Sequence, residues 1–519
     1  MKLSDLIRDL SFQYKLTGND DPEVHGIASD SRQVRPGYVF VALVGGSSDG
    51  HRYIKSAKEN GAVAVVGTQA TEGLDIPYLQ VEESRMVLPY LAAAYYGYPA
   101  RKLTMIGVTG TDGKTTTTNM IYQILLAAGL KAGMISTINA VIGEQVLDTG
   151  FHVTTPDAPD VQRYLAQMVE ARLTHVVLEV TSHGLAQYRA DACEFDIAVV
   201  TNITHEHLDY HGSYEAYRSA KARLFTNLGS TLPKPQGNPR LAVLNRDDAS
   251  FEYLDRLYNG PKVTYGTLIE ADVRPLQVVS HINGVEFQFV GRGLDFPLTC
   301  NLTGVFNIHN SLAATAATVI GLGLPMQAAQ EGIAALKSVP GRMESIDLGQ
   351  NFAAIVDFAH TPNALENALR TARQLTRGRV IAIFGAAGLR DRQKRRMMAA
   401  TSVELADISI LTAEDPRTEL LDDILEEMAA GAASSGGIEQ KTFWRIPDRG
   451  QAIRFAISLA RPGDVVISCG KGHEQSMCFG EIEYDWDDRT AMRAALSEHL
   501  GVPGPKMPYL PTQEEKLSS

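Results

Sequence analysis

The stretch that decides the fold runs from residue 103 to residue 117 and reads LTMIGVTGTDGKTTT. Its first part, the apolar run from Leu103 to Val108, predicts a buried β-strand, and a helix is expected to follow the loop. Glycines at 110 and 113 let backbone N–H groups turn toward a polyphosphate, and the positive N-terminal end of the helix adds to that attraction. The stretch therefore predicts a phosphate-binding loop for ATP or GTP.

Two side chains of this loop carry its chemistry. The Lys114 ammonium can neutralise the outer phosphates, and the Thr115 hydroxyl can ligate Mg²⁺. The loop is a shortened variant, because Val108 stands where the usual motif has its first glycine. A glycine turn with an incidental Lys-Thr pair is the alternative interpretation. If the loop does bind phosphate, its ATP-binding residues are Gly110, Thr111, Asp112, Gly113, Lys114, Thr115 and Thr116.

The composition is that of a globular protein. The 519 residues suffice for about three domains of ~150 residues each; 44% are hydrophobic and 21% are charged. No apolar stretch approaches the ~18 residues of a membrane-spanning helix, and charges interrupt the first ten positions too early for a signal peptide. We therefore expect a cytoplasmic protein without membrane insertion. The formal net charge of −12 argues against nucleic acid as the main partner.

The cysteines bear on the redox state. Cys193, Cys300, Cys469 and Cys478 are widely spaced and form no CxxC pair. This spacing favours reduced, mostly buried thiols over disulfides or a zinc site.

For the oligomeric state, we expect a monomer.

Three α/β blocks follow one another along the chain. The first, up to residue 99, has strand candidates at 39–44 and 62–66 and a helix at 54–60 between them. Further strands are expected at 103–108, 174–180, 196–201 and 240–244 in the second block, and at 352–356, 379–384, 408–411 and 464–468 in the third. The third block has the pattern of an open parallel sheet, whose ligands collect at the carboxyl ends of the strands. A Pro-rich, charged tail past Gly501 is expected to be disordered.

Further candidate site residues follow strands of the second block. Glu179 ends a strand, and after a phosphate loop such a glutamate favours holding Mg²⁺ or positioning water over a purely structural role. Residues 205 to 211, HEHLDYH, contain three histidines and two acidic residues. Their spacing lacks the HExxH arrangement and a thiol, so Mg²⁺-linked phosphate chemistry ranks above zinc and above a solvated loop. From residue pattern alone, Lys221 is a surface lysine of a helix.

The order of these motifs resembles that of the Mur ligase family, from about residue 20 to about residue 500. Besides the phosphate loop, the likeness rests on Asp30-Ser31-Arg32, Asp49-Gly50-His51, Glu179 to Leu185, His205 to Gly212 with Lys221, Asn307 to Asn310, Gly341-Arg342-Met343-Glu344, Asp357 to Pro362, Gly385 to Arg395 and Gly470-Lys471-Gly472-His473-Glu474. The resemblance implies an α/β fold with the three-domain architecture of this family.

The domains of the family would fall on the three blocks. Residues 1–99 would bind the UDP-sugar, 100–338 would form a central P-loop ATPase domain, 339–501 a C-terminal Rossmann-like domain that binds an amino acid, and 502–519 a disordered tail. The resemblance implies an ATP- and Mg²⁺-dependent amide ligase of peptidoglycan precursor synthesis. Its substrate would be UDP-N-acetylmuramoyl-L-alanyl-D-glutamate, whose terminal carboxylate becomes an acyl phosphate that the amine of a diamino acid captures.

The resemblance also implies roles for single residues. The catalytic residues would be Lys114, Glu179, His207 and Lys221, and the metal ligands Thr115, Glu179, His207 and Lys221. Lys221 would be N6-carboxylysine, an anionic carbamate, which reverses the surface-lysine interpretation. ATP contacts outside the loop would come from Asn307, Arg342 and Asp357. The UDP-sugar and dipeptide would contact Ser31, Thr154, Thr155, Ser182, Gln187 and Arg189, and the amino acid would contact Arg390, Asp415, Arg417, Gly470 and Glu474.

The segment Glu414-Asp415-Pro416-Arg417 bears on which diamino acid is added. It stands where diaminopimelate-adding relatives have Asp-Asn-Pro-Arg, so the arginine is kept and the asparagine is not. A guanidinium can pair in bidentate fashion with the second carboxylate of meso-diaminopimelate, which lysine and ornithine lack. Asp415, however, resembles lysine-adding members, and its carboxylate can occupy Arg417 internally. Meso-diaminopimelate is the first choice, with L-lysine or L-ornithine as the alternative.

Two remoter alternatives belong to other classes. A folylpolyglutamate synthetase-like ligase shares the phosphate loop and the modified lysine but lacks a UDP-binding first block, so Asp30-Ser31-Arg32 argues against it. A nucleotide-binding regulatory protein without catalysis would be expected to lose Lys114, Glu179, His207 or Lys221, and the sequence retains all four. The ligase interpretation therefore ranks first.

Overall fold

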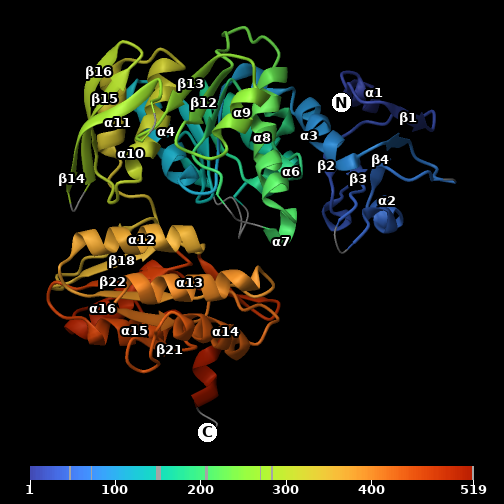
Figure 1. Ribbon diagram of the computed structural model, residues 1–519. Coiled ribbons are helices and arrows are strands. Elements are labelled where there is room, and N and C mark those ends of the chain that lie inside the picture. The colour runs from blue at the N-terminus through green and yellow to red at the C-terminus, as the bar shows by residue number, and fades with distance from the viewer. Residues whose placement is uncertain are drawn as a thin grey trace. The chain divides into compact units, whose positions relative to one another are not determined.

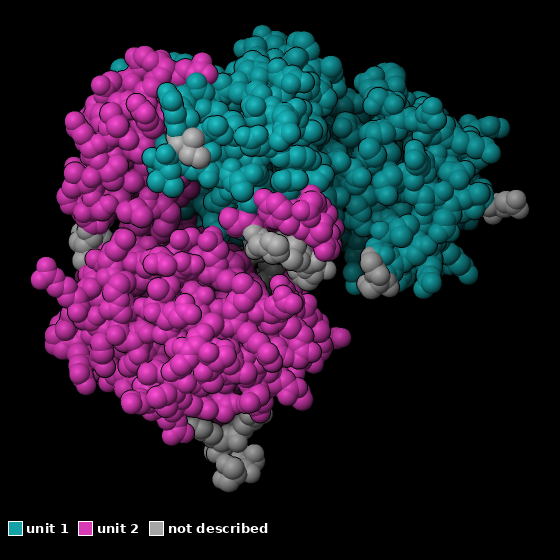
Figure 2. Space-filling model, in the orientation of Figure 1, with its two compact units in different colours: residues 1–203, 218–272, 313–329 teal, residues 204–217, 273–312, 330–519 magenta. Residues whose placement is uncertain are grey.

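The computed structural model describes residues 1–45, 48–71, 73–147, 154–204, 208–268, 270–281 and 284–516. The chain divides into two compact units (Figure 2), and Figure 1 labels its helices and strands. Unit 1 comprises residues 1–203, 218–272 and 313–329, and unit 2 comprises residues 204–217, 273–312 and 330–519. Among the helices within the described ranges, none has the length and apolarity needed to span a bilayer.

The first sheet of unit 1 has five strands in the order β1-β5-β4-β3-β2. Side chains of β3 alternate between two cores, as expected for a sheet covered on both faces. Val39 and Val41 pack with helices α1 (Leu3–Ile7) and α3 (Ser84–Tyr95), while Phe40 packs with α2 (Ile54–Glu59). The strands are β1 (Tyr14–Thr17), β2 (Gly26–Ala28), β3 (Tyr38–Val41), β4 (Ala62–Gly67) and β5 (Tyr78–Val81).

The second sheet of unit 1 holds the phosphate loop. Within this unit its strand order is β13-β12-β11-β6-β10-β7-β8-β9, parallel from β13 to β7 and antiparallel in β8 and β9. The strands are β6 (Thr104–Thr109), β7 (Ala132–Ile135), β8 (Ala140–Ile142), β9 (Gln145–Leu147), β10 (His175–Glu179), β11 (Ile197–Val200), β12 (Leu241–Asn245) and β13 (Lys262–Tyr265). Every residue of β6 is buried, as for a central strand of a parallel sheet.

Helices connect these strands. The helix that follows the phosphate loop is α4 (Lys114–Ala127). The other helices of this part of the chain are α5 (Ala158–Glu170), α6 (Ser182–Ala186), α8 (Tyr214–Ser230) and α9 (Phe251–Leu257), with short 3₁₀ turns at Ser31–Gln33, Gly50–Tyr53, Pro99–Lys102 and Asp191–Cys193.

Unit 2 begins with elements that precede its main sheet. Strands β14 (Val273–His281), β15 (Gly284–Gly291) and β16 (Leu294–Cys300) form an antiparallel meander. The short helix α7 covers Leu208–His211, α10 covers Asn307–Thr315, a π-helical turn covers Ala316–Ile320, and α11 covers Met326–Ala335.

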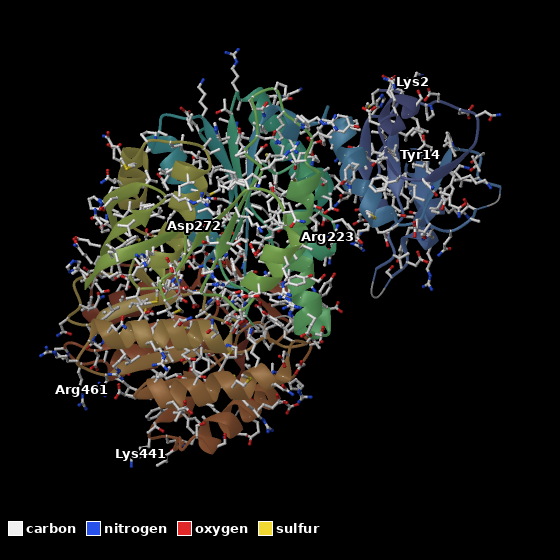
Figure 3. All side chains as sticks on the ribbon, turned by 45° about the horizontal axis from the view of Figure 1, so that its top comes forward. Lys2, Tyr14, Arg223, Asp272, Lys441 and Arg461 are labelled. Carbon is white, nitrogen blue, oxygen red and sulfur yellow. The ribbon has the colours of Figure 1, made fainter. Side chains whose placement is uncertain are left out.

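The main sheet of unit 2 is the middle of three layers, between two layers of helices. Its order is β17-β18-β22-β19-β20-β21, with β18, β22, β19, β20 and β21 parallel and β17 antiparallel. The strands are β17 (Glu344–Ser345), β18 (Ala353–Asp357), β19 (Val380–Phe384), β20 (Ile408–Leu411), β21 (Phe443–Arg445) and β22 (Val465–Cys469). Charged side chains such as Lys441 and Arg461 lie at the surface of this unit (Figure 3).

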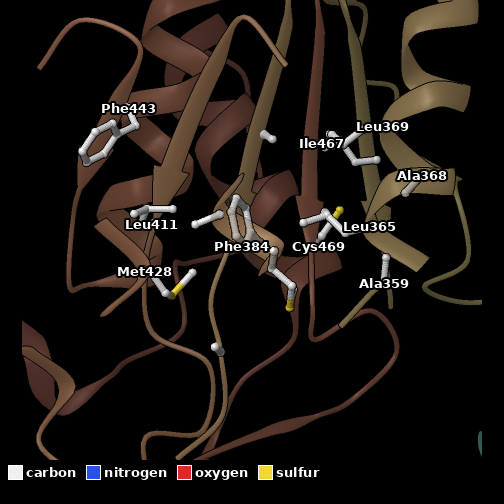
Figure 4. Packing of buried hydrophobic residues seen from close by; sticks show 14 of the residues in the cluster. Ala359, Leu365, Ala368, Leu369, Phe384, Leu411, Met428, Phe443, Ile467 and Cys469 are labelled. Carbon is white, nitrogen blue, oxygen red and sulfur yellow. The ribbon is translucent and has the colours of Figure 1, made fainter. Parts of the chain in front are cut away.

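Alternate strand residues of this sheet face opposite helical layers. Phe384 and Ile467 pack with α12 (Pro362–Leu375), α13 (Arg392–Leu405) and α14 (Leu421–Ser434), as Figure 4 shows for part of the cluster. Ile383 and Val466 pack on the other side with α15 (Arg449–Leu459) and α16 (Asp488–Leu500). A hairpin of β23 (Ser476–Phe479) and β24 (Ile482–Asp485) follows the last strand of the sheet.

The strands expected from the sequence are confirmed, with ends shifted by at most three residues, and so is the parallel arrangement of the third block. The cysteines are free thiols, and Cys193, Cys300 and Cys469 are buried. The expectation of a disordered tail, however, is wrong for residues 502 to 513. Leu510 is 0% exposed in the second core of unit 2, and the Thr512 hydroxyl donates to Asp448 Oδ2 at 2.7 Å.

Replacing Leu510 by alanine should lower the free energy of unfolding of unit 2 by about 2 to 5 kcal/mol, because it removes a fully buried side chain and leaves a cavity. Urea unfolding followed by tryptophan fluorescence measures this, since both tryptophans, Trp444 and Trp486, lie in this unit. Val502→Ala, at a residue that is 42% exposed, is the control. Equal midpoints for the two variants would contradict a packed tail.

Candidate active site

The phosphate loop turns on two glycines between β6 and α4. Gly110 has φ 152° and Gly113 has φ 79°, both in the region that favours glycine. A Cβ atom at Gly110 would lie 1.8 Å from Thr201 Oγ1, so a side chain at this position collides with the end of β11. The loop can take this path only because residue 110 is glycine.

Residues at the end of β11 hold the loop in place. The Thr111 N–H donates to the Asn202 carbonyl at 2.7 Å, and the Asp112 N–H donates to Asn202 Oδ1 at 3.0 Å. The Thr201 hydroxyl donates to the Asp112 carbonyl at 2.5 Å. Sequence reasoning missed this role of Asn202, although its position directly after a strand of the same parallel sheet is the signal that could have revealed it.

Lys114 begins α4 and reaches back over the loop. Its ammonium donates to the Thr111 carbonyl at 2.7 Å, and its side chain is half-buried. The first N–H groups of a helix have no partner within that helix, and they carry the positive end of its dipole. The loop therefore presents a lysine and a helix N-terminus at one place, which is the arrangement that binds a polyphosphate.

Glu179 lies beside the loop, as a fully buried carboxylate. It ends β10, next to β6, and is 0% exposed. The Thr115 hydroxyl donates to its Oε1 at 3.0 Å and the Thr137 N–H donates to its Oε2 at 3.0 Å. A hydroxyl and a carboxylate are the hard oxygen ligands that Mg²⁺ prefers, so this pair fits the metal that the sequence implies.

The other two predicted metal ligands are His207 and Lys221, and only Lys221 lies among the described residues. His207 lies outside the described residues, as do His205 and Glu206. Within the described ranges no group of three or more His, Cys, Asp or Glu side chains could hold a metal ion. Lys221, on α8, is 1% exposed, and its ammonium donates to the Gly110 carbonyl at 2.5 Å. The surface-lysine interpretation is therefore wrong, because this lysine is buried against the phosphate loop.

Four of the residues expected to contact the dipeptide cluster near the end of β10. Arg189 Nη1 donates to the Thr155 carbonyl at 2.8 Å, and Arg189 Nη2 donates to Gln187 Oε1 at 2.7 Å. Thr155 Oγ1 accepts the Thr181 N–H at 3.0 Å, and Thr181 directly precedes the buried Ser182. Thr154 precedes Thr155 in the chain. Ser31 begins the 3₁₀ turn Ser31–Gln33 that follows β2, where it is buried and its carbonyl accepts Asn60 Nδ2 at 2.9 Å.

Unit 2 carries the remaining nucleotide-side candidates. Asp357, at the end of β18, accepts the Met343 N–H at 2.7 Å and the Ala359 N–H at 2.8 Å. The bond from Met343 holds the neighbouring Arg342 close to Asp357. The Arg342 guanidinium lies 4.5 Å from the centre of the Phe358 ring. Asn307 begins α10, where its Nδ2 donates to the Thr303 carbonyl at 3.0 Å and its Oδ1 accepts Asn310 Nδ2 at 2.9 Å.

The amino-acid candidates meet beyond the ends of β20 and β22, and Lys471 connects them. Its ammonium lies 3.0 Å from Asp415 Oδ1 and 2.5 Å from Glu474 Oε2. Asp415 and Arg417 have φ 39° and φ 56°, strained values for residues other than glycine, and such strain is typical of functional sites. Gly470 directly follows β22 at the same edge of the sheet. Arg390 is exposed on the loop before α13.

Glu414 is a buried acid at this edge that sequence reasoning did not select. Burial raises the pKa of its carboxyl group, while Lys394 and His360 oppose that rise. A Cβ atom on Gly470 would lie 2.9 Å from Glu414 Oε2, so the glycine leaves that oxygen room. Close by, burial lowers the pKa of His473 to about 3, and this imidazole is therefore neutral at pH 7.

A phosphate loop at the carboxyl edge of a parallel sheet, with a buried carboxylate and a buried lysine beside it, defines a nucleotide-dependent enzyme. Three family models match in chain order. They are the Mur ligase family catalytic domain at residues 23–96, the Mur ligase middle domain at 108–318 and the Mur ligase glutamate ligase domain at 341–472.

Relatives of known name match along almost the whole chain. The UDP-N-acetylmuramoyl-L-alanyl-D-glutamate--2,6-diaminopimelate ligase of Geobacillus thermodenitrificans is 41% identical over 499 residues, which covers 96% of this chain and 100% of the relative. The UDP-N-acetylmuramyl-tripeptide synthetase of Roseiflexus sp. is 42% identical over 492 residues, covering 93% and 96%. The chain belongs to the Mur ligase family, as its motifs predict.

A solved structure supports the same assignment. A UDP-N-acetylmuramoyl-L-alanyl-D-glutamate--2,6-diaminopimelate ligase superposes with a TM-score of 0.63 and 30% sequence identity, covering 92% of this chain and 95% of that one. The predicted α/β fold with Mur ligase architecture is confirmed.

Gly110→Ala should weaken ATP binding by at least about 10-fold, because the added Cβ displaces the loop that holds the phosphates. Isothermal titration with ATP measures this. Gly129→Ala is the matched control, since Gly129 also has positive φ, 74°, but a Cβ atom there meets nothing within 4 Å. If the two variants bind ATP equally well, the loop does not depend on the clearance between Gly110 and Thr201.

Proposed function

We propose that this Mur ligase adds meso-diaminopimelate to UDP-N-acetylmuramoyl-L-alanyl-D-glutamate with hydrolysis of ATP to ADP. The observation that carries the proposal is the 41% identity, over almost its full length, to a relative named for this reaction. The buried Thr115 and Glu179 pair beside the phosphate loop supports the nucleotide chemistry. The product is the tripeptide precursor of peptidoglycan.

The reaction has two steps. A terminal D-glutamate oxygen attacks the γ-phosphorus of ATP, the bond to ADP breaks, and an acyl phosphate forms. The amine of the diamino acid then attacks the acyl carbon, loses a proton, and phosphate leaves as the amide forms. Because charge moves onto the transferring phosphoryl oxygens, positioned cations and N–H donors lower the barrier.

Residues of unit 1 would serve the first step. The loop N–H groups and the Lys114 ammonium would hold the phosphates and follow the developing charge. Thr115 and Glu179 would hold Mg²⁺, which, when bound, neutralises charge on the phosphate oxygens. The family resemblance adds His207 and Lys221 to these ligands. The cluster of Thr155, Gln187 and Arg189 would bind the dipeptide end that carries the reacting carboxylate.

Lys221 would act as a carbamate. An ammonium buried beside a metal site is unfavourable, whereas a carbamate is an anion with two oxygens that can ligate Mg²⁺. The position of Lys221, against the backbone of the phosphate loop, supports this role. Neighbouring Lys114 would remain the unmodified lysine that contacts phosphate.

Arg417 supports meso-diaminopimelate as the amino acid. The Nε atom of Arg417 is buried and has no hydrogen-bond partner within the described part of the chain. The Oδ1 atom of Asp415 is bonded instead to Lys471 and to the Cys478 N–H. The guanidinium is therefore available for the second carboxylate of the substrate. L-Lysine or L-ornithine is the second candidate, which the aspartate at 415 favours.

Three further features belong to this proposal. We propose the domain bounds 1–99, 100–338 and 339–501, each of which contains one of the three family matches, at 23–96, 108–318 and 341–472. A cytoplasmic location is supported by the reduced cysteines and the nucleotide substrates. We also propose that the enzyme acts as a monomer.

Lys221→Ala should lose nearly all activity, and short carboxylic acids such as acetate should restore part of it by supplying the missing anion. The readout is ADP release in the presence of both substrates. Lys262→Ala, at a half-buried lysine of β13, is the control. Full activity of Lys221→Ala would show that no carbamate is needed.

Arg417→Ala should lower kcat/KM for meso-diaminopimelate by about 10² to 10⁴-fold, because a buried charge–carboxylate pair is lost, and should affect L-lysine far less. The assay measures tripeptide formation with ATP and the UDP-linked dipeptide for meso-diaminopimelate, L-lysine and L-ornithine. Arg461→Ala, at an exposed residue labelled in Figure 3, is the control. Wild-type preference for L-lysine or L-ornithine would refute the diaminopimelate assignment and leave the ligase assignment standing.

A further inference from the structure

Lys471 is a fully buried charge with two acidic neighbours. Its side chain is 0% exposed, and its ammonium contacts Asp415 Oδ1 at 3.0 Å and Glu474 Oε2 at 2.5 Å. Burial alone would lower the pKa of Lys471, but Glu474 and Asp415 together raise it above its usual value, so the lysine stays charged. The described structure thus contains a buried cation between one buried carboxylate, that of Asp415, and one half-buried carboxylate, that of Glu474.

Asp415 needs a partner because its own carboxylate is also buried. It follows β20 by four residues and is held by three bonds: its carbonyl accepts the Gly388 N–H at 2.9 Å, and Oδ1 accepts both Lys471 Nζ and the Cys478 N–H at 3.0 Å. A buried carboxylate that loses its cation recruits another or is protonated. Lys471, two residues after β22, is the cation that this chain provides.

Arg417 is a second cation of this loop, two residues after Asp415. The Arg417 N–H donates to the Cys478 carbonyl at 3.1 Å, and the Cys478 N–H donates to Asp415 Oδ1. Cys478 therefore binds both residues, and the side chains of Asp415 and Arg417 extend from the same short stretch of backbone. Both charges also act on the Cys478 thiol: Asp415 raises its pKa and Arg417 lowers it, although burial is the largest cause of its overall rise. An aspartate without Lys471 would therefore lie on the same short stretch of backbone as the Arg417 cation.

We propose that Lys471 is a positioning residue for amino-acid specificity: by holding the Asp415 carboxylate, it keeps Arg417 open for the distal carboxylate of the substrate. This inference rests on the proposed function. An asparagine at 415 would carry no charge to compete for Arg417, so the contact with Lys471 matters because this chain has aspartate there.

A double-mutant cycle tests the proposal. The variants are D415N, K471M and D415N/K471M, with K471Q made in parallel so that the result does not depend on the folding of one protein. For each, kcat and KM are measured with meso-diaminopimelate and with L-lysine, together with the KM for ATP and the thermal unfolding midpoint. A purely structural role of Lys471 predicts equal losses for both amino acids.

The proposal predicts a specific pattern. K471M and K471Q should lower kcat/KM for meso-diaminopimelate by about 10²-fold, mainly through KM, with a much smaller loss for L-lysine. D415N alone is the reference for the cycle, because it removes the competing carboxylate while Lys471 and Arg417 stay in place. D415N in the K471M background should recover at least about 10-fold for meso-diaminopimelate, since the competing carboxylate is gone. The KM for ATP should not change.

Two results would overturn the inference. One is a K471M loss that D415N does not rescue, and the other is an equal loss for both amino acids. A wild-type enzyme that makes no product with meso-diaminopimelate would instead refute the proposed amino acid before any variant is compared. Thus the failure of the inference and the failure of the proposed function give different results.

Discussion

The missing Cβ atom of Gly110 is the constraint on which the arrangement around the phosphate loop depends. With 1.8 Å between a side chain at 110 and Thr201, the loop and the end of β11 can approach only through bare backbone. That approach lets Asn202 bind two successive N–H groups of the loop and places the Gly110 carbonyl where the Lys221 ammonium reaches it. Thr115, the second residue of α4, then lies within reach of Glu179. One absent methyl group thus sets the positions of several charged groups.

Both units build their sites by the same rule. In a parallel sheet the carboxyl ends of neighbouring strands share an edge, so residues far apart in sequence meet there. Thr115, Glu179 and Asn202 meet beyond β6, β10 and β11, and Asp415 and Lys471 meet beyond β20 and β22. At both edges buried carboxylates are paired with hydroxyl, N–H or ammonium donors, which offsets the cost of burying them.

Sequence patterns were sufficient for the strands, the phosphate loop and the parallel topology, because buried strands are continuous apolar runs and glycine positions mark forced turns. They failed where a property depends on distant partners. Lys221 looks like a surface residue of a helix, and only its contact with Gly110, more than a hundred positions away, buries it. The tail after Gly501 has the composition of a disordered segment, yet Leu510 has a core to enter. The Asp415–Lys471 pair was also beyond sequence reasoning, since it joins two motifs that composition treats separately.

The backbone conformation at residue 415 limits which amino acids can occupy that position. With φ at 39° and a proline after it, the position is unfavourable for most side chains, and aspartate and asparagine are among the few non-glycine residues that tolerate left-handed conformations. These two amino acids differ by one codon base and by one charge. A lineage can therefore alternate between a neutral and an acidic residue at this site without remodelling the loop, provided that a buried ammonium such as that of Lys471 is already present to receive the charge.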